Sequence, residues 1–181
     1  MRSMALFTAC TLVACEGFGI SVGGGDNGDP TPAGDATEVI EGTLDEGDVI
    51  ALDWAHSLYC WPQPQDAKFS GAHVLYERSQ AADRDFTMRV RPSSTLDVSI
   101  YYIQRSAGET VLPPDITNAF DCGATYEFDD DSNPGQAEVV LASGSSNAFE
   151  LVIGVAGAND AEVGSYTLEI WDEPSEDIFG D

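Results

Sequence analysis

Positive charge is scarce in this sequence, which has 7 Lys and Arg residues against 32 Asp and Glu residues and a formal net charge of −25. A field of that sign repels the phosphates of nucleic acids and the headgroups of anionic lipids. We therefore exclude nucleic acid as a partner, and we exclude direct electrostatic attachment to a membrane. Hydrophobic residues still make up 43% of the chain, which is enough for a packed core, so global disorder is not expected.

Residue types that carry catalysis or bind zinc are also few. The sequence has 2 histidines, His56 and His73, and its 4 cysteines form no CxxC pair and no zinc-binding spacing with histidine. From Glu38 onward the sequence has no G-x-S-x-G elbow, no phosphate loop and no dinucleotide-binding turn. One enzyme hypothesis remains, a hydrolase triad that combines His56 with the nearby Asp53 and Ser57. We expect the histidines to lie in loops or at strand edges, and we predict that the protein is not an enzyme.

The sequence also lacks an apolar run of the ~20 residues that a membrane-spanning helix needs. Its N-terminal run, Met4–Ala14, follows Arg2 and is interrupted only by small polar side chains. A short apolar run after a positive charge is typical of a secretory signal peptide, so we predict export.

The run ends in Leu12-Val13-Ala14-Cys15, which resembles the lipobox of bacterial lipoproteins. The resemblance implies cleavage after Ala14, a diacylglyceryl group on the Cys15 sulfur, and acylation, for example with palmitate, of the new amino terminus. More than one acyl chain gives a stable membrane anchor. Glu16 follows the cysteine and favours the outer membrane or the cell surface. An ordinary signal peptide without lipid and a chance apolar start are the alternatives.

Composition divides the chain into four segments. Residues 1–14 are the predicted lipoprotein signal peptide, and residues 15–37, rich in Gly, Asp and Pro, are the acylated cysteine with a flexible tether. Residues 38–173 are the predicted folded domain, and residues 174–181 are a short acidic tail. This arrangement holds one folded domain away from a membrane.

The cysteines predict one disulfide. Cys10 leaves with the signal peptide and Cys15 takes the lipid, so Cys60 and Cys122 remain in the exported domain. Because disulfides form and persist outside the cytoplasm, we predict a bridge between Cys60 and Cys122.

From Glu38 onward, apolar residues alternate with polar ones, which predicts strands with one buried face. Turn-forming residues separate these segments, and no long amphipathic helix is found. Eight or nine short strands of this kind predict an all-β fold, an antiparallel β-sandwich of jelly-roll type. The expected strands are Glu38–Leu44, Val49–Trp54, Ala72–Arg78, Phe86–Arg91, Val98–Ile103, Ala124–Phe128, Ala137–Ala142, Phe149–Val155 and Tyr166–Ile170.

Three segments of this domain resemble bacterial pre-peptidase C-terminal domains. Glu41–Leu52 resembles their opening hairpin, Leu96–Tyr102 their central strand, with Ser99 where a second acid is common, and Gly164–Ile170 their closing G-x-Y strand. The resemblance implies a compact β-sandwich that accompanies secreted enzymes and aids export, adhesion or substrate contact. The segment between Trp54 and Lys68, with its cysteine, departs from the family pattern.

Aromatic residues gather around Cys60, where Trp54, Tyr59 and Trp61 lie close together in the sequence. If exposed, these rings would bind by stacking on sugars or packing against a partner protein. Burial beside the disulfide is the other interpretation, and the one we favour. Trp171 is out of phase with the core face of its strand, which predicts partial exposure.

Oxygen ligands cluster in one turn, at Asp129, Asp130, Asp131 and Asn133. Calcium accepts irregular coordination by about 6–8 oxygens, so this turn is a candidate calcium site. A solvated acidic turn without metal is the alternative. We expect no required cofactor.

Together these patterns predict a non-catalytic, surface-displayed lipoprotein that serves as an accessory or adhesion module. The membrane is its partner through the lipid anchor, and a surface protein or a polysaccharide is the expected further partner. A carbohydrate-binding module that uses Trp54, Tyr59 and Trp61 is the first alternative, and a secreted hydrolase that uses His56 is the second.

Overall fold

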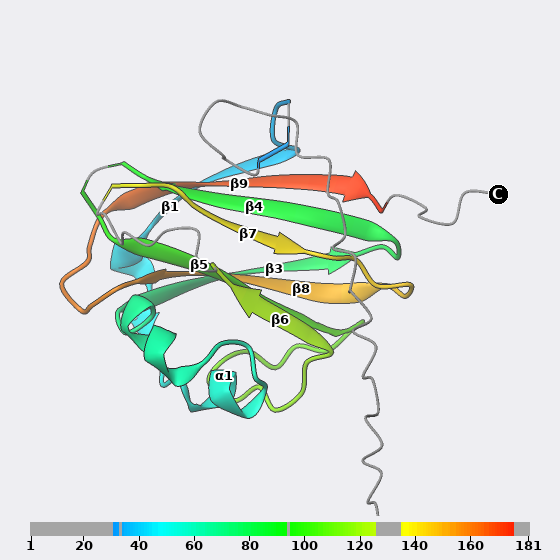
Figure 1. The fold of residues 1–181 in the computed structure, drawn as a ribbon, viewed down its shortest axis with the longest axis horizontal. Helices are drawn as coiled ribbons and strands as arrows, with labels where there is room; N and C mark the ends of the chain where they lie inside the picture. Colours follow the sequence, from blue (N-terminus) through cyan, green and yellow to red (C-terminus); the bar gives the residue numbers. More distant parts are fainter. Residues whose placement is uncertain (1–30, 33, 94, 126–134, 176–181) are drawn as a thin grey trace, which may run out of the picture.

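The computed structural model describes residues 31–32, 34–93, 95–125 and 135–175, which form two packed β-sheets with a further layer on one side (Figure 1). Three short helical segments, η1 (Leu44–Glu46), α1 (Asp53–Ser57) and η2 (Gln63–Lys68), interrupt the strands. No helix in the described ranges is long and apolar enough to cross a membrane. The strands are β1 (Glu38–Thr43), β2 (Asp48–Val49), β3 (Ala72–Gln80), β4 (Arg84–Pro92), β5 (Val98–Ser106), β6 (Asp121–Ala124), β7 (Glu138–Ala142), β8 (Phe149–Gly157) and β9 (Ser165–Pro174).

The strand order defines a jelly roll. A four-stranded sheet has the order β1-β9-β4-β7, and a five-stranded sheet has the order β2-β3-β8-β5-β6. All neighbouring strands are antiparallel. Without the two-residue β2, successive strands cross between the sheets except at β5 and β6, which are neighbours in one sheet, and this is the order of two Greek keys. The predicted antiparallel jelly-roll sandwich is confirmed.

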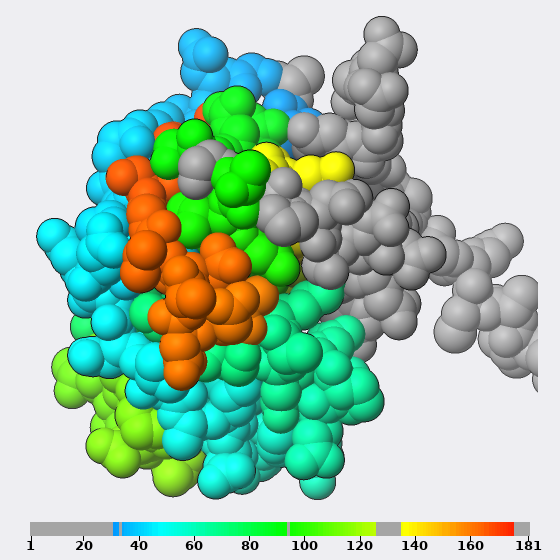
Figure 2. All heavy atoms as spheres, turned by 90° about the vertical axis from the view of Figure 1, so that its left-hand side faces the viewer, coloured from blue at the N-terminus to red at the C-terminus, as the bar shows by residue number. Residues whose placement is uncertain are grey.

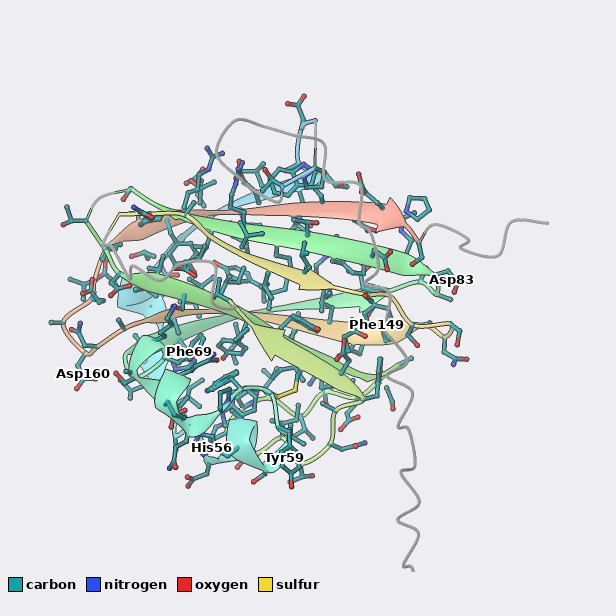
Figure 3. All side chains as sticks on the ribbon, in the orientation of Figure 1. His56, Tyr59, Phe69, Asp83, Phe149 and Asp160 are labelled. Carbon is teal, nitrogen blue, oxygen red and sulfur yellow. A yellow bond between two sulfur atoms is a disulfide. The ribbon has the colours of Figure 1, made fainter. Side chains whose placement is uncertain are left out.

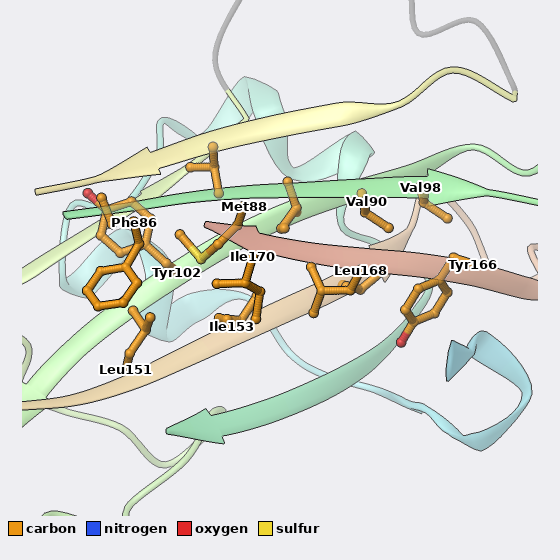
Figure 4. Close-up of a cluster of buried hydrophobic side chains, with 14 of the residues drawn as sticks. Phe86, Met88, Val90, Val98, Tyr102, Leu151, Ile153, Tyr166, Leu168 and Ile170 are labelled. Carbon is orange, nitrogen blue, oxygen red and sulfur yellow. The ribbon is translucent and has the colours of Figure 1, made fainter. Parts of the chain in front are cut away.

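The main core lies between the two sheets and follows the alternation in the sequence (Figure 4). On β4, Phe86, Met88 and Val90 are buried, and the register places Met88 beside Ile170 of β9. Full burial of one such side chain stabilises a fold by about 1.5–3 kcal/mol. The other buried members are Leu44, Leu96, Val98, Ile100, Tyr102, Val140, Ala142, Phe149, Leu151, Ile153, Val155, Tyr166 and Leu168.

A second interior, which we call the outer core, lies on the other face of the five-stranded sheet. At the centre of that sheet, β5 and β8 are buried on both faces, because α1, η2 and the adjoining loops cover the outer side. The buried residues of the outer core are Trp54, Ala55, Cys60, Trp61, Phe69, Tyr101, Ile103, Ile116, Ala124, Val152 and Ala156. The protein therefore has three layers rather than two.

The segment Val49–Trp54 is not the strand that we expected. Strand β2 ends at Val49, and α1 begins at Asp53. Trp54 and Ala55 are adjacent and both belong to the outer core, whereas adjacent residues of a strand point to opposite faces. The helical turn lets both residues face the outer core.

The strand expected at Ala124–Phe128 is also shifted, because β6 ends at Ala124, and Phe128 lies outside the described residues. The register places Cys122 opposite Ile103 of β5, whose side chain belongs to the outer core. The residues that form edge strand β6 are therefore those that cover the outer core.

Trp171 is buried, contrary to our expectation, with 5% of its surface exposed. Its Nε1 donates a hydrogen bond to the carbonyl of Gly34 at 3.2 Å, and the Arg89 guanidinium carbon lies 5.0 Å from the ring centre. Beside it, burial would raise the pKa of Glu169, but hydrogen bonds from Arg89 and Arg91 outweigh burial and lower it. The residues before β1 thus cover part of the outer face of the four-stranded sheet.

One end of the sandwich is closed by the loop between β8 and β9, drawn in orange in Figure 2. The Ser70 hydroxyl donates to the carbonyl of Ala158 at 2.6 Å, and the Leu44 backbone N–H donates to the carbonyl of Gly164 at 2.9 Å. This loop therefore ties η1 and the segment before β3 to the ends of both sheets.

Candidate functional site

A disulfide fastens the outer layer to the sheet beneath it. Cys60 lies just after α1 and Cys122 lies in edge strand β6, and the bridge between them spans 5.0 Å from Cα to Cα. The predicted pairing is confirmed. Because the bridge joins positions 62 residues apart, it fixes the loop containing α1 and η2 against the five-stranded sheet.

Two of the three aromatic residues near this disulfide are buried. Trp54 is 4% exposed and Trp61 is 3% exposed, and their ring centres lie 5.3 Å apart in an edge-to-face arrangement. Both indoles also pack on Tyr101 of β5. The structure therefore does not bring Trp54, Tyr59 and Trp61 together on one exposed face, as the carbohydrate-binding alternative required.

Tyr59 is the exception, with 91% of its surface exposed. It follows the C-cap of α1 and has a backbone φ of 61°, in the left-handed region. Glycine is the usual residue at this position of a helix end, and a side chain there costs about 1–2 kcal/mol. Since the ring is solvated, no burial offsets this cost.

A hollow of about 270 Å³ lies beside Tyr59, lined also by His56, Trp61, Pro62 and Gln63. Figure 3 shows Tyr59 and His56 on the α1 side of the molecule, far from β1 and β9. The hollow is thus built from α1, the disulfide loop and the start of η2. It is the candidate functional site.

Asp66 of η2 organises the wall of this hollow. One carboxylate oxygen, Oδ1, lies 2.8 Å from His56 Nε2 and accepts a hydrogen bond from Trp61 Nε1 at 3.1 Å. A carboxylate only accepts hydrogen bonds, so the hydrogen of a neutral His56 lies on Nε2. The other nitrogen, Nδ1, is left as an acceptor and has no partner among the described residues.

The predicted hydrolase triad does not form. The Ser57 hydroxyl donates to the backbone carbonyl of Asp53 at 2.9 Å, one helical turn earlier. His56 pairs with Asp66 instead of Asp53. The grouping of Asp53, His56 and Ser57 in the sequence reflects a short helix and not a catalytic constellation.

His73 is a residue of β3, and its side chain is buried beside the outer core. Its Nδ1 lies 3.0 Å from the Tyr101 hydroxyl, and its Nε2 lies 2.8 Å from the carbonyl of Phe69. A neutral ring satisfies both contacts, with Nε2 donating to Phe69 and Tyr101 donating to Nδ1. Burial lowers the pKa of His73 below its ordinary 6.5, although the bond to Phe69 acts the other way.

The low pKa of His73 predicts a loss of stability in acid. In the unfolded chain His73 takes up a proton near pH 6.5, whereas in the folded chain it does so only at lower pH. Neutral His73 therefore contributes fully to the free energy of unfolding above pH 6.5, and this contribution declines as the pH falls toward the folded pKa. We expect His73→Gln, which stays neutral, to remove this contribution. Urea unfolding at about pH 7.5 and about pH 5 measures it. A wild-type advantage over the variant that does not shrink in acid would contradict the prediction.

Two other predicted sites lie outside the described residues. They are the acylated Cys15 and the acidic turn at Asp129, Asp130, Asp131 and Asn133. Within the described ranges, no three His, Cys, Asp or Glu side chains are grouped so as to hold a metal ion. The calcium site and the lipid anchor stay predictions.

These features define a class, an antiparallel jelly-roll β-sandwich with a disulfide-fastened layer outside one sheet. No family model and no curated protein matches the sequence. Among solved structures, the chain is similar to the pre-peptidase C-terminal domain of a collagenase from Bacillus anthracis, at 14% identity and a TM-score of 0.36, over 76% of this chain and 90% of that one. At that TM-score, neither a family nor an activity follows from the likeness.

Proposed function

We propose that the protein is a non-catalytic lipoprotein, anchored through acyl chains on Cys15, whose β-sandwich serves as an accessory or adhesion module at the bacterial surface. The observation that carries the proposal is the disulfide between Cys60 and Cys122, because such bridges belong to oxidising compartments outside the cytoplasm. It agrees with the lipobox-like Leu12-Val13-Ala14-Cys15 at the end of an apolar leader.

The positions of the two histidines support a role without catalysis. A general base has to lie within hydrogen-bond reach of the group that it activates. His73 is buried and uses both ring nitrogens for the fold, and His56 is paired with a carboxylate rather than with a hydroxyl. Neither histidine is therefore hydrogen-bonded to a serine or cysteine side chain of the described residues.

The start of the described chain supports display. The described chain begins along the outer face of the four-stranded sheet, where Gly34 and Thr37 bond to β9. The layer with α1 lies on the opposite side of the molecule (Figure 1). The described chain thus begins on the side of the molecule away from the hollow beside Tyr59.

The anchor is tested with Cys15→Ala in the full chain. Because the thiol is the acceptor of the diacylglyceryl group, we expect this variant to incorporate no labelled palmitate and to leave the membrane fraction. Cys10→Ala is the matched control and should behave as the wild type, since Cys10 lies in the cleaved leader. Labelling of Cys15→Ala, or its retention by the membrane, would refute the proposed anchor.

A further inference from the structure

We infer that the hollow beside Tyr59 binds the sugar rings of a neutral polysaccharide. The Tyr59 ring stacks on one sugar face, while His56 and Gln63 form hydrogen bonds with sugar hydroxyls. This names the ligand class of the module proposed above, and it rests on that proposal only for the presentation of the site outside the cell.

The stability of the fold does not account for a tyrosine at position 59. Its ring is almost fully solvated, so it contributes little to either core. Its backbone has the left-handed conformation that glycine adopts without strain. A tyrosine held there at a cost to stability is typical of a residue kept for binding.

The walls of the hollow combine apolar and polar groups. The Tyr59 ring and the ring of Pro62 are apolar, and they lie beside the polar groups of His56 and Gln63. Asp66 fixes the tautomer of His56, so that Nδ1 is ready to accept a hydrogen bond from a hydroxyl. The Gln63 amide both donates and accepts. An apolar face with donors and acceptors at its edge matches a sugar ring, which has a C–H face and a rim of hydroxyls.

The size and openness of the hollow favour a polymer over a small ligand. Pockets that enclose small molecules measure about 300–1,000 Å³, and this one is about 270 Å³ beside a solvated ring. A sugar chain that lies across the surface needs only one ring in contact. The disulfide at Cys60, the residue after Tyr59, holds the position of the site before binding.

Charge and surroundings decide between ligand classes. The formal charge of −25 repels polyanionic polysaccharides and so favours a ligand without negative charge. A protein partner needs an interface of about 1,200–2,000 Å² with several apolar anchors. No other exposed large apolar side chain of the described residues lines this hollow. The exposed large apolar side chains that lie elsewhere on the surface are Val39, Val49, Val111, Phe120, Leu141 and Val163.

The test uses the full chain, extracted in a sugar-free detergent, in affinity electrophoresis against a soluble β-glucan, a mannan and polygalacturonate. We expect at least one neutral polymer to retard the protein and the anionic polymer to leave it unretarded. Tyr59→Ala should weaken binding at least about tenfold, which is about 1.4 kcal/mol. Tyr59→Phe, which keeps the ring, should bind within about twofold of the wild type.

Stability separates a binding residue from a structural one. Tyr59→Gly should raise the melting temperature by about 3 °C, because it relieves the backbone, and should abolish binding. Tyr59→Ala keeps the strained backbone and should leave the melting temperature nearly unchanged. Retardation unaffected by Tyr59→Ala, no retardation by either neutral polymer, or preferred binding of a proline-rich peptide would each overturn the inference. If the protein binds sugar but its Cys15 carries no lipid, the proposed anchor is refuted and the sugar-binding inference stands.

Discussion

The double variant Cys60→Ala/Cys122→Ala is expected to lose about 4 kcal/mol of its free energy of unfolding, from the entropy of closing a loop between residues 62 apart. The bridge restricts the unfolded chain far more than the folded one, where both residues are already held by the outer core. Urea unfolding followed by tryptophan fluorescence measures the loss, because Trp54 and Trp61 lie beside the bridge.

Reducing agent provides the matched control for this experiment. It should destabilise the wild type by about the same amount and leave the double variant unchanged, since the variant has no bridge to reduce. A loss below about 1 kcal/mol, or an equal effect of reductant on both proteins, would show that the bridge does not carry this stability.

Tyr101→Ala is expected to be similarly damaging, at about 3–5 kcal/mol, the usual cost of removing a large buried ring. Tyr101 is fully buried at the centre of the outer core, where it packs on Trp54, Trp61 and Phe69. Its ring also fills the space above Gly154 on the neighbouring strand, where a Cβ would lie 2.0 Å from the ring carbon Cζ. Alanine would leave a cavity among these rings and above Gly154.

Tyr101→Phe is the control, because it keeps the ring and removes only the hydroxyl that donates to Nδ1 of His73. Leaving that buried acceptor without a partner should cost about 1–3 kcal/mol. Thermal unfolding of the three proteins ranks them. Equal stability of the Ala and Phe variants would mean that packing of the ring contributes nothing, contrary to the structure.

The strands with only one buried face were predictable from the sequence, because their apolar and polar residues alternate. In β4, Phe86, Met88 and Val90 alternate with polar residues, and the structure buries those three. The outer core was less predictable, because β5 and β8 are buried on both faces and such strands lose their alternation. The run Val152-Ile153-Gly154-Val155 in β8 is a signal of this second layer.

The candidate site was only partly predictable. The sequence places Trp54, Tyr59 and Trp61 together, but sequence position does not show which way each ring points. The turn of α1 directs Trp54 inward, and the left-handed backbone at Tyr59 turns that ring outward. The pairing of His56 with Asp66, 10 residues apart, depends on how α1 and η2 pack, which no periodicity reveals.

The disulfide also determines how the protein bears mechanical load. A polymer bound at Tyr59, as inferred above, would pull on the chain one residue from Cys60, and the disulfide would pass this force to Cys122 through a covalent bond. The force thereby bypasses the short turns of α1 and η2 and reaches β6, whose hydrogen bonds to β5 distribute it over the five-stranded sheet. The outer layer is thus covalently attached to the five-stranded sheet next to the residue where the force would act.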